Sequence, residues 1–203
     1  MKQTAKFISY VFHPIMMPLF GLIIIFHSGV YAIDIPVEYK RFVYSAILLC
    51  DVLLPLSIIP GLIYFRRIKN YTLDVRRERL IPLFFTTICF YIGYYFVSKM
   101  APVRLINLFL FSSTVVVLVI LFISLFWKIS IHMAGIGGLT GMIISISFIY
   151  GLDTAILLSI VIFIAGLLAS SRLALNAHNI LQLLAGFFVG GVFVFGLMLR
   201  LLS

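Results

Sequence analysis

The chain has 203 residues, of which 64% are hydrophobic and 10% are charged, whereas a soluble domain is roughly 45–50% apolar and 25% charged. A mean hydropathy of +1.24 therefore excludes a soluble globular protein. Fifteen Lys and Arg against six Asp and Glu give a net charge of +9, and in so apolar a chain this charge must lie in short loops beside a membrane. We expect no nucleic-acid partner.

Apolar runs separated by charged or turn residues predict seven helices, each of about the length that crosses a bilayer, roughly 20 residues. They lie near residues 7–30, 43–65, 80–100, 105–127, 133–150, 154–171 and 179–202. The connections are short, and the sequence shows no linker or internal repeat. We predict a single all-α domain over residues 1–203, a polytopic transmembrane bundle of six or seven helices.

The first apolar run, residues 7–26, follows two lysines, as the apolar run of a signal peptide would. It is longer than the roughly 7–15 residues of a signal peptide's apolar region, and Pro14 and Pro18 interrupt it. We therefore predict a retained first helix rather than a cleaved leader. Its two histidines, His13 and His27, have no visible partner, and we interpret both as interfacial.

The second predicted helix carries one acidic residue, Asp51, inside its apolar run. A carboxylate in a membrane-spanning segment is costly, so a proton or ion site is the default hypothesis for such a residue. Because the sequence shows only one of them, we favour a structural hydrogen bond to another helix.

The connection after the second helix is strongly basic, since residues 66–79 hold six of the 15 basic residues in 14 positions. Two predicted helices separate this connection from residues 128–132, and two more separate residues 128–132 from residues 171–178. All three segments therefore emerge on the same face of the membrane. These positions allow a site assembled from three loops.

The last of these segments leads into the seventh helix, with His178 at its start and Gln182 one turn further along the same face. The amide of Gln182 can then form a hydrogen bond with the ring of His178. Gly186 and Gly190 continue the four-residue spacing, which lets this face pack closely on a neighbouring helix. His178 should point into the bundle, either as a functional group or as a polar cap of a buried helix end.

The other two segments add cations and helix starts. Lys128 and Ser130 precede a predicted helix N-terminus, whose exposed N–H groups can bind an anion. Arg76 and Arg79 stand just before Pro82, which suits the first turn of the third helix. Each cluster alone is compatible with a positive-inside signal. Together the three segments supply more Arg, Lys and His on one face than orientation requires, which favours a phosphate site.

These segments resemble, in their order, spacing and shared face, the signatures of the type-2 phosphatidic acid phosphatase and haloperoxidase superfamily. The resemblance covers about residues 66–186 of a motif-bearing core of about residues 66–190. Residues 171–182 are similar to the third signature, Ser-Arg-x5-His-x3-Asp, with Gln182 in place of the aspartate. Residues 129–132 are similar to the second, Pro-Ser-Gly-His, with isoleucines in place of the proline and the glycine.

The first signature, Lys-x6-Arg-Pro, has two competing registers in the basic loop. Lys69 with Arg76 keeps its spacing but is followed by Arg77 instead of proline. Arg79 with Pro82 is the alternative. We favour Arg76 and Arg79 over Lys69 as phosphate ligands.

The resemblance implies hydrolysis of a lipid phosphate or pyrophosphate in two steps, without a metal or cofactor. His178 would attack phosphorus to form a phosphohistidine, His132 would protonate the leaving oxygen, and Gln182 would orient His178. The residues that would hold the phosphate oxygens are Arg172, Arg76, Arg79, Lys128, Ser130 and Lys69.

Two other functions stay open. A catalytically degenerate protein that binds a lipid phosphate is favoured by Gln182 and Ile131, which depart from the signatures. A small transporter or flippase is favoured by Asp51 and by the prolines of the first two helices. Sensitivity to His178→Ala separates the phosphatase from both, and dependence on Asp51 separates the transporter.

We expect an integral protein of a bacterial inner (plasma) membrane, and the sequence predicts neither its oligomeric state nor which lipid phosphate it takes. The face that carries the three segments holds ten basic residues against five on the other, which the positive-inside rule would place in the cytoplasm. If five of the ten bind phosphate, the count is even, and the orientation stays open.

Overall fold

The computed structural model describes residues 2–27, 29, 35–68, 75–100 and 103–202. The chain is 87% helical and has no strand within these ranges. Seven helical segments of the described chain are long and apolar enough to cross a membrane. The predicted all-α transmembrane bundle is thereby confirmed.

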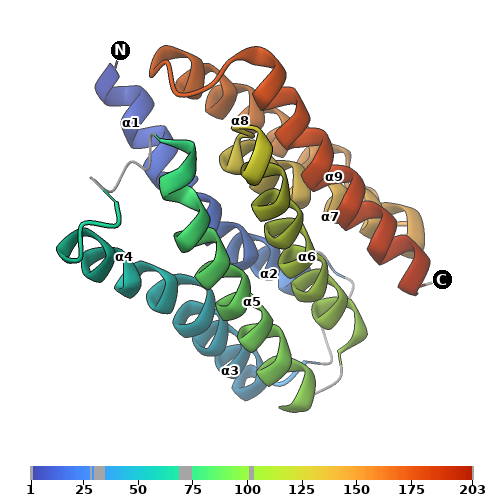
Figure 1. Ribbon diagram of the computed structural model, residues 1–203. Coiled ribbons are helices and arrows are strands. Elements are labelled where there is room, and N and C mark those ends of the chain that lie inside the picture. The colour runs from blue at the N-terminus through green and yellow to red at the C-terminus, as the bar shows by residue number, and fades with distance from the viewer. Residues whose placement is uncertain (1, 28, 30–34, 69–74, 101–102, 203) are drawn as a thin grey trace.

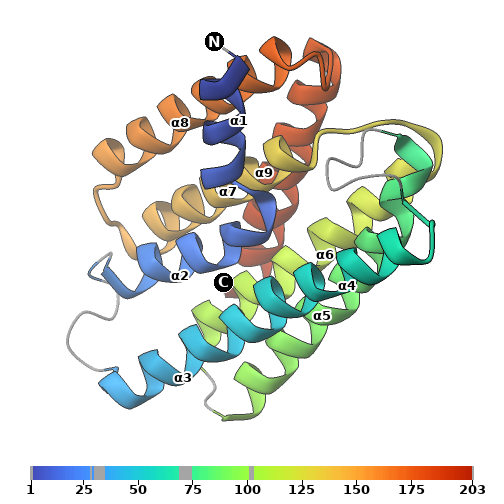
Figure 2. The same cartoon turned by 90° about the vertical axis from the view of Figure 1, so that its left-hand side faces the viewer.

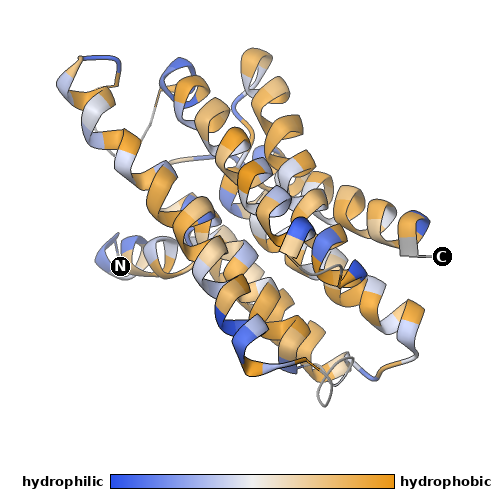
Figure 3. Ribbon diagram, turned by 90° about the horizontal axis from the view of Figure 1, so that it is seen from below, coloured by the Kyte–Doolittle hydropathy of each residue, from blue (hydrophilic) through white to orange (hydrophobic). Residues whose placement is uncertain are grey.

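The helical elements include two short 3-10 turns, η1 and η3, and one π-helical segment, η2 (Figure 1). In chain order they are α1 (Lys2–Val11), η1 (Pro14–Met16), α2 (Met17–His27), α3 (Val37–Ile47), η2 (Leu48–Leu53), α4 (Leu54–Tyr64), η3 (Arg76–Arg79), α5 (Leu80–Met100), α6 (Arg104–Phe126), α7 (Ile131–Tyr150), α8 (Ala155–Ala174) and α9 (Ile180–Leu202). The helices α5 to α9 begin and end within three residues of their predicted positions. Hydropathy locates them well because apolar residues cover them along their length (Figure 3).

The first span differs from its prediction because it is broken in the middle. The helix α1 ends at Val11, and α2 begins only at Met17, after η1. A proline has no N–H and restricts the residue before it to extended conformations, and His13, which precedes Pro14, has φ −64° and ψ 136°. Pro14 therefore divides the span into two helices that run in different directions (Figure 2).

The second span begins at Val37 instead of residue 43, because a charged turn outside the apolar run is also helical. Its middle, η2, is π-helical and directly precedes α4, which has Pro55 in its first turn. Asp51 of η2 is 1% exposed, and its Oδ1 has no hydrogen-bond partner among the described residues. The interhelical hydrogen bond that we favoured is therefore not made by this atom.

Of the seven spans, α7 is the most buried, since 67% of its most apolar stretch lies inside the bundle. The helix α9 packs along α7 through glycines. A Cβ atom on Gly190 would lie 1.9 Å from the carbonyl oxygen of Ala134, and one on Gly186 would lie 2.5 Å from that of Ser130. The close packing predicted from the four-residue glycine spacing is confirmed. This contact brings the start of α9 against the start of α7.

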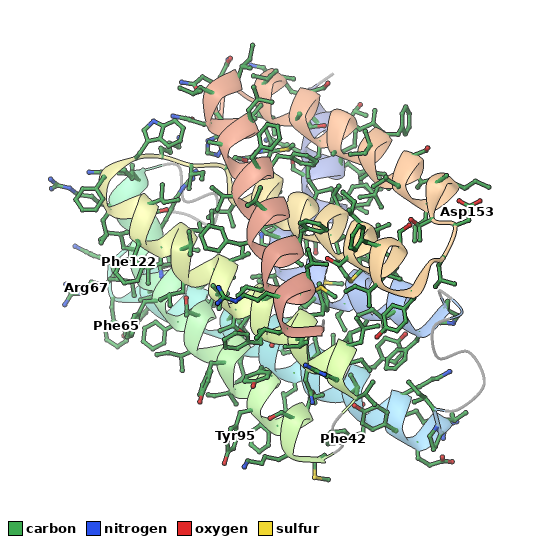
Figure 4. All side chains as sticks on the ribbon, turned by 90° about the vertical axis from the view of Figure 1, so that its right-hand side faces the viewer. Phe42, Phe65, Arg67, Tyr95, Phe122 and Asp153 are labelled. Carbon is green, nitrogen blue, oxygen red and sulfur yellow. The ribbon has the colours of Figure 1, made fainter. Side chains whose placement is uncertain are left out.

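Successive spans cross the bundle in opposite directions, so the connections between them lie alternately at its two ends. The N-terminus lies beside the α8–α9 connection, and the C-terminus lies at the opposite end (Figure 1). Arg67 and Asp153 likewise lie at opposite ends (Figure 4). Since α1 packs against α8 and η3 packs against α6, the N-terminal helix and the basic segments gather at one end.

Candidate functional site

His178 lies in the connection between α8 and α9, and the residue is 8% exposed, so its ring is buried in the bundle. Its Nδ1 donates to Oε1 of Gln182 at 3.0 Å, the hydrogen bond that the four-residue spacing predicts. An amide oxygen only accepts, so Nδ1 carries the proton and Nε2 keeps the lone pair of the neutral ring. Nε2 is therefore the ring atom of His178 whose lone pair is available as a base or nucleophile.

The same amide also caps the N-terminus of α9. Oε1 of Gln182 accepts from the backbone N–H of Asn179 at 3.3 Å, and Oδ1 of Asn179 accepts from the backbone N–H of Gln182 at 2.9 Å. This reciprocal pair is a capping box. We did not predict a role for Asn179, although Asn-x-x-Gln before an apolar run is its sequence signature. The orientation of His178 is thus tied to the start of α9.

Cations from three separate segments act on His178. They are Arg79 of η3, Arg172 of the last turn of α8 and Lys128 of the α6–α7 connection. Burial lowers the pKa of His178 to about 4, the hydrogen bond to Gln182 opposes this shift, and the three positive charges add to the lowering. At neutral pH the ring is uncharged, so its lone pair is available for attack on an electrophile.

The two favoured arginines of the basic loop take different positions. Arg79 is 5% exposed, and its Nη1 donates to the carbonyl of Ile129 at 3.5 Å. Nη1 of Arg76 donates instead to the carbonyl of Leu125, at the end of α6, where carbonyls lack helical partners. Residues three apart in a 3-10 turn lie on the same side, so both arginines face the α6–α7 connection. Lys69, the competing residue, lies outside the described residues.

The hydroxyl of Ser130, which we predicted to hold phosphate, caps a helix. Its Oγ accepts from the N–H of Met133 at 3.4 Å as the N-cap of α7, and the residue is fully buried. The N–H of Ser130 donates to the carbonyl of Gln182 at 3.2 Å. Ser130 therefore fixes the start of α7 to the start of α9, and it holds the connection that carries Lys128 next to His178.

His132, the second predicted histidine, lies in the first turn of α7 and faces the first span. Its Nε2 donates to the carbonyl of Ser9 at 3.1 Å. Its ring meets that of His13 edge to face, with centroids 5.5 Å apart. Arg172 acts electrostatically on His13, His132 and His178, so the three histidines and this charge form one cluster, called the histidine cluster below.

The interpretation of His13 as an interfacial residue without a partner is therefore wrong. Two features of the sequence point to its position. Counting crossings places the N-terminus on the face of the three basic segments, and Pro14 breaks the helix directly after His13. Hydropathy alone cannot say which neighbour a broken helix contacts, because the packing of α1 against α8 decides that.

The site around His178 combines its neutral ring, the imidazole of His132 and three cations. The cations are Arg79, Arg172 and Lys128. Such a set can bind a tetrahedral oxyanion, because guanidinium and ammonium groups donate to its oxygens. It can also exchange a proton with that anion through an imidazole. Among the described residues, no three His, Cys, Asp or Glu side chains lie close enough together to hold a metal ion.

No protein-family model, no curated protein and no solved structure matches the chain. A bundle of apolar spans is compatible with many functions, so the fold alone does not choose among them. The function is therefore inferred from the residues around His178.

Proposed function

We propose that the chain is an integral membrane phosphatase that hydrolyses a lipid phosphate or pyrophosphate through a phosphohistidine on His178. The observation that carries the proposal is the surroundings of this one ring. His178 is buried and uncharged, Gln182 binds its Nδ1, and cations from three segments act on it. Phosphate esters suit this combination, because cations stabilise their oxygens while a neutral imidazole attacks phosphorus.

In the first step, Nε2 of His178 attacks phosphorus, and the bond from phosphorus to the leaving oxygen breaks. The proton for that oxygen comes from the substrate's phosphate monoanion: the lone pair on Nδ1 of His132 takes it and passes it to the leaving oxygen, so the product leaves protonated and His132 is neutral again. Arg79, Arg172 and Lys128 stabilise the charge on the equatorial oxygens. In the second step, water attacks phosphorus, Nδ1 of His132 takes a proton from the water, and the bond between Nε2 of His178 and phosphorus breaks. His132 then gives the proton to the phosphate that is released, which restores its neutral ring.

Gln182 limits how fast this cycle runs. Its amide oxygen fixes the tautomer of His178 through a 3.0 Å hydrogen bond. Unlike a carboxylate, it adds no negative charge beside the cationic phosphohistidine, so the intermediate is less stabilised. We expect slow turnover.

The seven apolar spans support a lipid substrate, whose tail can stay in the bilayer while its phosphate reaches the cluster. An apolar cavity of about 50 Å³ lies between α2, α5, α6, α7 and α9, and its lining includes Pro14, the neighbour of His13, and Ile131, the neighbour of His132. Ligand pockets measure roughly 300–1,000 Å³, so this cavity is too small to hold the lipid chain itself. Because proteins of bacterial outer membranes are β-barrels, a helical bundle fits an inner (plasma) membrane, which we propose as its location.

Phosphate release by the purified protein in detergent tests the proposal. The substrates are phosphatidate, phosphatidylglycerol phosphate and a polyprenyl pyrophosphate, with a metal chelator present. We expect His178→Ala to lower turnover at least about 1,000-fold and His132→Ala about 100-fold. The matched control is His27→Ala, because His27 is exposed and its Nδ1 donates to the carbonyl of Ile23 in its own helix at 2.8 Å, with no contact to the histidine cluster among the described residues. Unchanged turnover in His178→Ala would refute the proposal.

A second candidate function, movement of a solute coupled to a proton or cation, is favoured by Asp51. Its carboxyl is buried in η2, and Oδ1 has no hydrogen-bond partner among the described residues. The π-helical segment η2 packs against η1, the break of the first span, and interrupted helices form ion sites in transporters. Two results together would favour this function. Proteoliposomes would take up a solute along with a proton or cation, and Asp51→Asn would abolish that uptake, while the unaltered protein would release no phosphate.

A further inference from the structure

The break in the first span leaves one backbone carbonyl available to another helix. In an uninterrupted α-helix, the N–H of His13 would donate to the carbonyl of Ser9, four residues earlier. Pro14 holds His13 in an extended conformation, with φ −64° and ψ 136°. The N–H of His13 therefore donates to the carbonyl of Tyr10 at 3.3 Å. Within lipid, a freed carbonyl must find another donor.

His132 of α7 supplies that donor, and this fixes which of its ring nitrogens carries the proton. Nε2 donates to the Ser9 carbonyl at 3.1 Å. A carbonyl oxygen only accepts, so Nε2 bears the hydrogen and Nδ1 bears the lone pair in the neutral ring. The first span thereby occupies one ring nitrogen of His132 and leaves the other for proton exchange.

His13 restrains the same ring from a second direction. Its ring packs edge to face against that of His132, with an interplanar angle of 76°. Its own orientation is fixed, because its Nδ1 accepts from the N–H of Ile15 at 3.4 Å. The helix that carries Ser9 packs against α8, whose last turn holds Arg172. The partners of His132 are thus anchored to the element that also supplies a cation to His178.

We propose that the proline break of the first span positions the general acid of the site: the freed carbonyl of Ser9 and the ring of His13 hold His132 so that Nδ1 takes the proton of the substrate's phosphate monoanion and transfers it to the leaving oxygen. This inference rests on the proposed phosphatase function. Ser9 and His13 are positioning residues, since both act through His132. The first span, which lies outside the residues that resemble the family signatures, is then part of the site.

Leaving-group dependence tests this role with Pro14→Ala, in which the N–H of His13 can return to the Ser9 carbonyl. A general acid matters for an alkyl leaving group, which needs a proton, and matters little for 4-nitrophenolate, which leaves without one. We expect kcat for phosphatidate to fall about 10- to 100-fold and kcat for 4-nitrophenyl phosphate to change less than about threefold, with KM unchanged for both. His13→Ala should show the same selectivity with a smaller loss.

The matched control is Pro60→Ala, because Pro60 is an exposed proline inside α4, in another span. Pro60→Ala should leave kcat unchanged for both phosphatidate and 4-nitrophenyl phosphate. Equal losses on both substrates in Pro14→Ala would mean general damage to the fold and would overturn the inference, as would full activity on phosphatidate.

A second measurement separates this inference from the phosphatase proposal, because it needs no turnover. The ¹⁵N chemical shifts of histidine-labelled protein report which ring nitrogen carries the proton, and His132→Gln identifies the signals of His132. We expect the Nε2–H tautomer in the unaltered protein and a mixture of tautomers in Pro14→Ala. An Nδ1–H tautomer, or no change in Pro14→Ala, would overturn the inference. Absence of phosphate release with the expected tautomers would overturn only the proposed function.

Discussion

Two of the seven spans are interrupted, and the two interruptions differ in what their polar groups contact. At Pro14 in the first span, a backbone carbonyl is freed and His132 of α7 donates to it. At η2 in the second span, the carboxyl of Asp51 is buried and its Oδ1 has no hydrogen-bond partner among the described residues. The two breaks lie next to each other, since η1 and η2 pack together.

An interrupted helix in a membrane therefore does not by itself identify a functional site. The residue that bonds the freed polar group does, because that residue decides whether the break can affect a reaction. At the first break, the freed carbonyl accepts a hydrogen bond from His132, on which the charge of Arg172 also acts. At the second break, no contact that the structure describes links Asp51 to a cation. We therefore expect phosphate release to respond to changes around the first break and the histidine cluster, and not to changes at the second break.

Outside the histidines themselves, the largest effect is expected from Arg172→Ala, because the charge of this guanidinium acts on all three histidines of the cluster. Loss of one donor to transition-state charge typically costs about 100- to 1,000-fold in kcat, and we expect a loss in that range. Steady-state phosphate release measures it. The control is Arg67→Ala, an exposed arginine, which should stay within about twofold. Equal effects of the two changes would contradict the assignment of the site.

The pH dependence is expected to be the next largest effect. Burial lowers the pKa of His178 to about 4, so kcat/KM should keep its value down to that pH and then fall about tenfold per pH unit as the ring is protonated. In the unfolded chain the ring takes up its proton at about pH 6.5, so the folded state should lose stability as the pH falls from 6.5 to 4. An acid limb near pH 6.5 that His178 alone controls would contradict this prediction.

A smaller effect, in the opposite direction, is expected from Gln182→Asp. A carboxylate can accept from Nδ1 of His178 as the amide does, and its charge stabilises the cationic phosphohistidine. We expect kcat to be equal or up to about tenfold higher, which corresponds to roughly 1.4 kcal/mol. Burst kinetics would show whether the intermediate accumulates to a higher level. Complete loss of activity would show that the amide N–H₂ group of Gln182 has an essential partner.

The smallest effect is expected from Asp51→Asn, which keeps the shape of the side chain and removes its ionisable group. Phosphate release should stay within about twofold, because η2 meets the first span at η1 but no hydrogen bond that the structure describes links Oδ1 of Asp51 to a histidine of the cluster. The comparison with Pro14→Ala is then direct, since each change alters one of the two interrupted spans. A large loss in Asp51→Asn would join the second break to the site and would favour the coupled-transport function.

Sequence patterns predicted the parts of the molecule that depend on spacing along one helix. Hydropathy predicted the seven spans, and a four-residue spacing predicted the hydrogen bond of His178 to Gln182. The glycine spacing predicted that the last helix packs closely on a neighbour, which the structure shows to be α7. Each of these follows from helical geometry and needs no knowledge of neighbouring helices.

The parts that the sequence did not predict depend on contacts between helices. The position of His13 against His132 follows from the angle that Pro14 introduces and from the packing of α1 on α8. The different partners of Arg76 and Arg79 follow from the way η3 packs against α6. Ser130 was predicted as an anion ligand, and its role as the N-cap of α7, in which its hydroxyl accepts from the N–H of Met133, was not predicted.

The most direct test of the central claim is to trap the phosphorylated protein during turnover of a lipid phosphate. The reaction would be stopped within one turnover at alkaline pH, where phosphohistidine survives, and the modified residue would be located by mass spectrometry. We expect phosphate on His178, formation slowed at least about 100-fold in His132→Ala, and none in His178→Ala. Hydrolysis without phosphate on His178, or with phosphate on another residue, would contradict the claim that His178 is the nucleophile.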